Sequence, residues 1–241
     1  MLALKAAYWH VQHPDWTIAM TFQTRALYQQ LIDLANRFTF AHGEDSVDPD
    51  HLRIMHAWGS ARREGVYQQM ATSVGLPARD FNYARAKYGM DQAFRGICRE
   101  LLDHCVDNPP TPIYDAVLID EAQDFPAEFF QLVWMFTKPP HRVVWAYDEL
   151  QILSESSMPS MSEMFGEDQA GRPLVELRNA PEKARQDIML PVCYRNTPWA
   201  LTTAHALGFG IYRPEGLVQH FDNPELWGEI GYEVLAGRLG L

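Results

Sequence analysis

Short apolar runs alternate with longer amphipathic stretches along most of the chain. An amphipathic stretch repeats its apolar positions every three or four residues and predicts a helix, whereas a short apolar run bounded by polar residues predicts a strand. Strands alternating with helices are typical of an α/β fold with a mostly parallel sheet. The runs predict strands at 16–22, 52–58, 114–119, 142–147 and 188–193, and helices at 2–13, 25–40, 127–136, 197–207 and within 60–106.

Local signals set several of the expected boundaries. Thr24 and Asp91 are expected to cap the helices that follow them. Pro126 suits the first turn of a helix, where its missing N–H costs nothing, and Pro139-Pro140 is expected to end that helix. Residues 154–186 are rich in Ser, Gly, Pro and charge, which predicts little regular structure.

Composition places the chain among globular proteins. Of 241 residues, 47% are hydrophobic and 21% are charged, a balance that supports a buried core. The three cysteines form no metal-ligand pattern, which predicts a reduced, cytoplasmic setting without disulfides or zinc. No signal peptide is recognisable, and no apolar run approaches the roughly 20 residues that span a bilayer, so no membrane partner is expected.

The net charge of −11 argues against sequence-independent binding of nucleic acid. Such binding depends on Lys and Arg side chains that neutralise phosphates. A local basic groove remains compatible with an acidic chain, so the charge lowers this hypothesis without removing it.

The most informative stretch is the apolar run 114–119, which leads directly into Asp120 and Glu121. In open α/β sheets, ligands bind at the carboxyl ends of the strands. Adjacent residues on a strand point to opposite faces, so the two acids have different roles. One can hold a hydrated Mg²⁺ while the other orients a water. The plainer interpretation is a strand that ends in solvated acids.

The longer run Val117-Leu118-Ile119-Asp120-Glu121-Ala122-Gln123-Asp124 resembles motif II, the Walker B element, of superfamily 1 helicases of the UvrD/Rep type. The resemblance implies that Asp120 binds Mg²⁺ and that Glu121 activates the attacking water. Further segments resemble other motifs of that family, in the family's order.

Two of these segments resemble contacts to a single strand. Residues 21–25 (Thr-Phe-Gln-Thr-Arg) resemble motif Ia, and residues 55–58 (Met-His-Ala-Trp) resemble motif Ib. An aromatic side chain there can stack on a base. The alternatives are a capping Thr24, a core Phe22 and a buried His or Trp. The resemblance implies a single-stranded DNA path lined by Thr21, Phe22, Thr24, Arg25, His56 and Trp58.

Two other segments resemble contacts to a nucleotide. Residues 146–151 resemble motif III, with Asp148 as the leading acid and Gln151 as the γ-phosphate sensor; Tyr147 replaces the family's usual Gly. Residues 190–196 resemble motif IV, in which Arg195 reaches the γ-phosphate, a role that suits a guanidinium. A solvated turn and a structural ion pair are the competing interpretations.

The resemblance covers residues 1–205 and implies a P-loop NTPase (RecA-like) domain: a parallel sheet flanked by helices, with a helical insertion at 59–110. Residues 206–241 remain unassigned. No G-x-x-x-x-G-K-[S/T] loop occurs. We therefore expect the phosphate loop and the first strand, an interior strand in the family, to be missing. Their absence is expected to leave an open sheet slot for pairing with another chain.

These observations lead to three hypotheses. The first is part of an ATP-dependent DNA helicase or translocase that uses ATP and Mg²⁺ on single-stranded DNA, inactive as this chain alone. The second is a non-catalytic ATPase-like binding or scaffold module. The third, a nuclease of the same α/β class, lacks the Asp-x-Glu-x-Lys run that it needs.

Overall fold

The computed structural model describes residues 1–43, 46–60, 62–148 and 159–188, together with residues 197, 199–200, 203–204 and 207. The chain divides into two compact units, Met1–Val175 and Glu176–Leu241. The sequence places the end of the first domain at 205, and that boundary stays a prediction. Everything that follows concerns the first unit.

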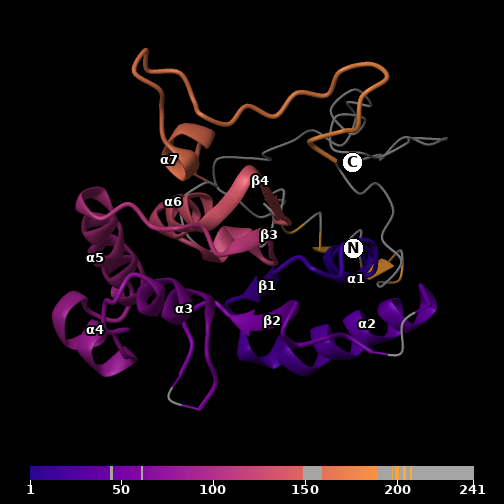
Figure 1. Ribbon diagram of the computed structural model, residues 1–241, viewed down its shortest axis with the longest axis horizontal. Coiled ribbons are helices and arrows are strands. Elements are labelled where there is room, and N and C mark those ends of the chain that lie inside the picture. Colours follow the sequence, from indigo (N-terminus) through magenta and orange to yellow (C-terminus); the bar gives the residue numbers. More distant parts are fainter. Residues whose placement is uncertain are drawn as a thin grey trace. The chain divides into compact units, whose positions relative to one another are not determined.

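A four-stranded parallel sheet forms the centre of this unit (Figure 1). Its strands are β1 (Ile18–Phe22), β2 (Leu52–His56), β3 (Tyr114–Ile119) and β4 (Thr137–Trp145), in the spatial order β2-β1-β3-β4. All three neighbouring pairs are parallel. The expected α/β class with a parallel sheet flanked by helices is therefore confirmed.

Helices cover both faces of the sheet (Figure 1). Ile18, Met20 and Phe22 of β1 share one core with α1 (Leu2–Gln12) and α2 (Tyr28–Ala41). The opposite core contains buried residues of α3 (Val66–Ser73), α5 (Ala93–Asp107), α6 (Ala127–Phe136) and α7 (Met161–Phe165). Because both faces are covered, β1 is buried along its whole length.

The expected helical insertion at 59–110 contains α3, α4 (Phe81–Tyr88) and α5. Two of these helices belong to the main core, since Tyr67 of α3 and Ile97 of α5 are fully buried in the cluster that covers β3. The insertion thus forms part of the layer over one face of the sheet. Only α4 is mostly exposed.

Several expected boundaries are wrong in detail. Thr24 precedes a 3-10 turn, Arg25–Leu27, but its side chain makes no capping hydrogen bond. Helix α5 follows Gln92 rather than Asp91, and it is Asp80 that caps α4 by accepting the N–H of Tyr83. Pro139 and Pro140 lie inside β4, which begins directly after α6. The expected strand at 188–193 and helix at 197–207 fall largely outside the described residues.

The four described strands form a continuous sheet, so no gap lies between them. The interior slot expected from the sequence is therefore not found among the described strands, since β1 pairs with β2 and β3, and β3 pairs with β4. Pairing of another chain with the sheet stays a prediction.

No membrane-crossing helix is present in the part of the chain that the structure describes, because none there is both long and apolar enough.

One carboxylate, that of Glu100 on α5, connects α4 and the segment before it to α5. It accepts hydrogen bonds from Arg79 (3.0 Å), Tyr83 (2.9 Å) and Lys87 (2.8 Å), and also from the Tyr88 hydroxyl. Partial burial raises the pKa of Glu100, but these four donors outweigh burial and lower the pKa to about 2. The carboxylate is thus charged and fully bonded at neutral pH.

We predict that Glu100→Gln lowers the free energy of unfolding at neutral pH by about 1–3 kcal/mol, because it weakens hydrogen bonds to a charged group. The folded-state pKa lies below the ordinary value of 4.5. The stabilisation is therefore complete above that value and is lost as the pH falls toward 2. Urea unfolding at several pH values measures both effects.

The matched control is Asp103→Asn, at an exposed position of the same helix. It is expected to change stability little. A Glu100→Gln penalty that persists unchanged at low pH would contradict the prediction.

Candidate functional site at the carboxyl edge of the sheet

Backbone hydrogen bonds hold three strand ends together at one edge of the sheet. The N–H of Asp120 donates to the carbonyl of Thr21 at 2.9 Å, which joins the end of β3 to β1. The N–H of Ala146 donates to Ile119 at 2.9 Å, and the N–H of Ala122 donates to Ala146 at 2.8 Å. The residues that follow β1, β3 and β4 therefore lie side by side.

Asp120 is half-buried at this edge. Burial raises its pKa and the nearby Glu121 carboxylate adds to the increase, whereas the amino group of Met1 acts in the opposite direction. Leu2 and Ala3, at the start of α1, belong to the same buried cluster as Leu118 of β3, so the start of α1 lies near the end of this strand. The start of α1 and the Asp120 carboxylate thus lie near the same part of the edge.

Glu121 has a left-handed backbone conformation, with φ 52° and ψ 54°. This conformation is uncommon for residues with a side chain, and strain of this kind concentrates at functional sites. It results from the sharp turn between the end of β3 and the 3-10 turn Ala122–Asp124. The turn lets the chain leave the sheet immediately after the two acids.

Gln123 connects Glu121 to the end of β4. Its Nε2 donates to Glu121 Oε2 at 2.7 Å, and its Oε1 accepts the backbone N–H of Asp148 at 3.2 Å. The sequence analysis gave Gln123 no role. The sequence signal that could have pointed to Gln123 was its place within the motif II resemblance. Its contact with Asp148 could not be foreseen, because the two residues are far apart in the chain.

The acids at this edge are crowded. Burial raises the pKa of Asp124, and the Glu121 carboxylate raises it further. In the described ranges, no three His, Cys, Asp or Glu side chains are grouped to hold a metal ion. Mg²⁺ commonly uses one or two carboxylates together with substrate phosphates and water. Asp120 and Glu121 fit that limited role.

The residues expected to contact a single strand divide into two groups. Thr21 and Phe22 are fully buried between the helix layers, so their side chains offer no surface to a ligand. Thr24 and Arg25 are exposed, and His56 and Trp58 are half-buried. The structure brings Arg25, His56 and Trp58 together around one hollow.

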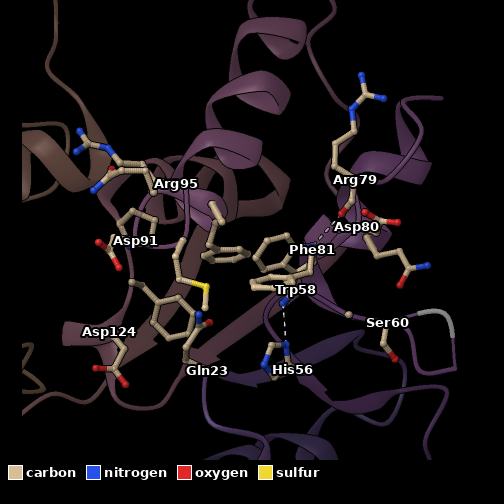
Figure 2. A pocket seen from close by; sticks show the side chains of 18 of the residues that line it. Gln23, His56, Trp58, Ser60, Arg79, Asp80, Phe81, Asp91, Arg95 and Asp124 are labelled. Atoms are coloured by element: carbon tan, nitrogen blue, oxygen red, sulfur yellow. Dashed lines mark hydrogen bonds between the residues drawn. The ribbon is translucent and has the colours of Figure 1, made fainter. Parts of the chain in front are cut away.

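This edge hollow has a volume of about 920 Å³ and lies between the carboxyl ends of β1, β2 and β3 and the helices α4 and α5 (Figure 2). Its lining includes Gln23, His56, Trp58, Gln68, Phe81 and Phe94. Gln123 and Asp124 also line it, so it adjoins the acidic site.

His56 fixes the position of Trp58 at the hollow. Its Nδ1 accepts the backbone N–H of Trp58 at 3.0 Å (Figure 2). Burial lowers the pKa of His56, a hydrogen bond to the Gln23 backbone opposes the change, and Arg25 lowers the pKa further. The imidazole is therefore neutral at physiological pH, which keeps Nδ1 available as an acceptor.

Two expected nucleotide contacts cannot be placed. Gln151 and Arg195 lie outside the described residues, so their roles stay predictions. Asp148, the leading acid of the motif III resemblance, follows β4 and contacts Gln123 through its backbone.

No protein-family model matches the chain, and no curated protein or solved structure matches it either. The geometry described above is therefore the basis for any conclusion about class and activity.

We predict that Glu121→Gly is more stable than Glu121→Ala by up to about 1 kcal/mol, because glycine adopts the left-handed region without strain. Both variants lose the contact with Gln123, so the difference between their stabilities reports the backbone strain at position 121. Chemical denaturation followed by tryptophan fluorescence measures the difference.

At Asp124, which has a negative φ, the same pair of substitutions should show the opposite order, with alanine more stable than glycine. Equal stabilities of Glu121→Gly and Glu121→Ala would rule out strain at Glu121.

Proposed function

We propose that this chain is part of an ATP-dependent DNA helicase or translocase of the UvrD/Rep type. The observation that carries the proposal is the position of Asp120, Glu121 and the Asp148 backbone at one sheet edge, with the start of α1 beside Asp120. Nucleotide hydrolysis needs a cation-binding carboxylate, a water-orienting acid and a positive helix end near one polyphosphate. Asp120, Glu121 and the start of α1 are the groups that we propose for these three roles.

In the intact protein, Asp120 would hold Mg²⁺ and Glu121 would orient the attacking water. Mg²⁺ would neutralise charge on the phosphates of ATP. Gln123 keeps the Glu121 carboxylate in place through its 2.7 Å hydrogen bond. Gln151 and Arg195 would contact the γ-phosphate, as the family resemblance implies.

The edge hollow supports the second half of the proposal, binding of single-stranded DNA. Single strands are bound by aromatic side chains that stack on bases and by cations that contact phosphates. Trp58 and Phe81 supply aromatic surface, and Arg25 is exposed at the lining. The hollow adjoins the acidic site through Gln123, so a strand and a nucleotide would bind next to each other.

A non-catalytic ATPase-like module is the second candidate. It is favoured by the sequence, which contains no G-x-x-x-x-G-K-[S/T] loop to hold the phosphates of a nucleotide. In that case the hollow would still bind its ligand, and the acids would have no catalytic use.

We predict that the purified chain binds single-stranded oligonucleotides more tightly than duplexes and less tightly at high salt. Arg25→Gln should lower the slope of log affinity against log salt concentration by about 0.7, the value for one phosphate contact on a single strand. Fluorescence anisotropy titrations at several salt concentrations measure this.

The matched control is Arg37→Gln, an exposed arginine of α2 that does not line the hollow. It should leave the slope unchanged. Absence of oligonucleotide binding, or equal binding of duplex and single strand, would refute the nucleic-acid part of the proposal.

We also predict negligible ATP turnover by this chain alone, because the phosphate-binding loop is absent from its sequence. A phosphate-release assay with Mg²⁺ and single-stranded DNA checks this, and Glu121→Gln should give the same background rate. Turnover that disappears in Glu121→Gln would show that the chain is a complete catalyst.

A further inference from the structure

The loop between β2 and α3 lies beside the edge hollow and carries two exposed arginines, Arg62 and Arg63. Figure 1 shows this loop extending away from the sheet. Ser60, in the same loop, lines the hollow, but neither arginine does. We refer to residues 59–60 and 62–65 as the basic arm. The arm therefore presents its positive charge next to the hollow and outside it.

Backbone contacts close the base of the basic arm. The Tyr67 N–H donates to the Ala57 carbonyl at 2.8 Å, which joins the start of α3 to the residue after β2. Gly59 and Gly65 lie so close together that a Cβ atom at either glycine would clash with the backbone of the other. The arm therefore leaves the sheet edge and returns to it at one place, and its base depends on two glycines.

Hydrogen bonds also hold the turn that carries the two arginines. The Ser60 N–H donates to the Arg63 carbonyl at 2.7 Å, and the Ser60 carbonyl accepts the Arg63 N–H at 3.3 Å. The Ser60 hydroxyl accepts the N–H groups of Arg62 and Arg63 at 3.3 Å and 3.1 Å. These bonds fix the backbone of the arm without a ligand, so less conformational entropy is lost when a ligand binds.

An aromatic ring supports the guanidinium of Arg63. Its Cζ lies 4.5 Å from the centre of the ring of Tyr28, the first residue of α2. The Tyr28 ring also contacts Phe22 at the end of β1, with 5.9 Å between the ring centres. The arm is thus attached to the strand end that precedes Arg25. A guanidinium that lies over an aromatic face keeps the N–H donors in its own plane available for a phosphate.

The cations at this corner are not neutralised by acids of the same chain. In the part of the chain that the structure describes, Arg25, Arg62 and Arg63 form no ion pair, whereas several other arginines lie within 4.0 Å of a carboxylate. The one acid of the arm, Glu64, accepts a hydrogen bond from the Gln69 amide of α3 at 2.7 Å. A local basic surface therefore exists on a chain whose net charge is −11, and it favours an anionic ligand.

From these observations, and resting on the single-strand binding proposed above, we infer that the basic arm is a second binding site for the strand, which holds its phosphates outside the hollow. Arg62 and Arg63 each contact one phosphate. Arg25 lines the hollow and lies three residues before Tyr28, so it connects the two sites. The arm carries no aromatic side chain, so its contacts go to the backbone of the strand and are independent of base sequence. The complete binding site thus covers more nucleotides than the hollow alone.

The test uses the whole chain and labelled oligothymidylates from about 4 to about 16 nucleotides, the range of site sizes known for single-strand domains. Anisotropy titrations at several salt concentrations give the slope of log affinity against log salt concentration for each length. In the native chain this slope should grow with length until the strand reaches the arm. Arg62→Gln and Arg63→Gln should each lower the slope by about 0.7 on the longest strands, the value for one phosphate contact, and the double variant by about 1.4. The slope on the shortest strands should not change.

Tyr28→Leu tests the support of Arg63 separately from its charge. It removes the ring but keeps both arginines, so it should weaken binding of the longest strands about 2- to 5-fold, as expected for one cation–π contact, without changing the slope. Arg37→Gln is the matched control, because Arg37 is exposed on the same helix as Tyr28 and lies in neither the arm nor the hollow. It should change neither affinity nor slope, and circular dichroism should show that every variant is folded.

The outcomes separate this inference from the proposed function. Long strands that bind the native chain and both arginine variants with the same slope would overturn the inference and leave the proposed function intact. An equal loss on the shortest and longest strands would contradict a separate site outside the hollow. An equal loss in Arg37→Gln would show that only the overall charge matters, which also overturns the inference. No binding of any oligonucleotide would overturn both proposals.

Discussion

The candidate site depends on the parallel hydrogen-bonded register of β1, β3 and β4. Because the three strands run in one direction, their carboxyl ends meet at one edge, and the bonds Asp120–Thr21 and Ala146–Ile119 extend that register to the residues that carry chemistry. Helix layers on both faces bury the strands and exclude alternative pairings. The hydrogen-bonded register of the sheet is what brings these acids close together.

The edge contains several energetically unfavourable features. Glu121 is held in a left-handed conformation, and the pKa values of Asp120 and Asp124 are raised by burial and by the Glu121 carboxylate. Each feature costs free energy, and surrounding packing offsets such costs at sites that bind ligands. A cation at this edge would relieve the mutual repulsion of the carboxylates.

The helical segment between β2 and β3 connects this acidic edge with the hollow beside it. Helices α3 and α5 belong to the main core. Tyr83 and Lys87 of α4 bond to Glu100 of α5, whereas Phe81 and Arg85 of α4 are exposed. Gln123 borders both regions, since it bonds to Glu121 and also lines the hollow. One side chain thus contacts both the Glu121 carboxylate and the hollow.

The sequence by itself determined the order of the four described strands and the position of Asp120 and Glu121 at a strand end, because hydrophobic periodicity reflects which faces are buried. It did not predict α7, which lies in a stretch rich in Ser, Gly, Pro and charge. Only the tertiary structure decided which neighbouring side chains are accessible. Thr21 and Phe22 are buried because helices cover both faces of β1, whereas Gln23, just beyond the strand, lines the hollow. Two further contacts join residues that are distant in sequence: the hydrogen bond between Gln123 and Asp148, and the ring contact between Phe81 and Trp58. The pattern of hydrophobic and polar residues along the chain carries no information about such contacts.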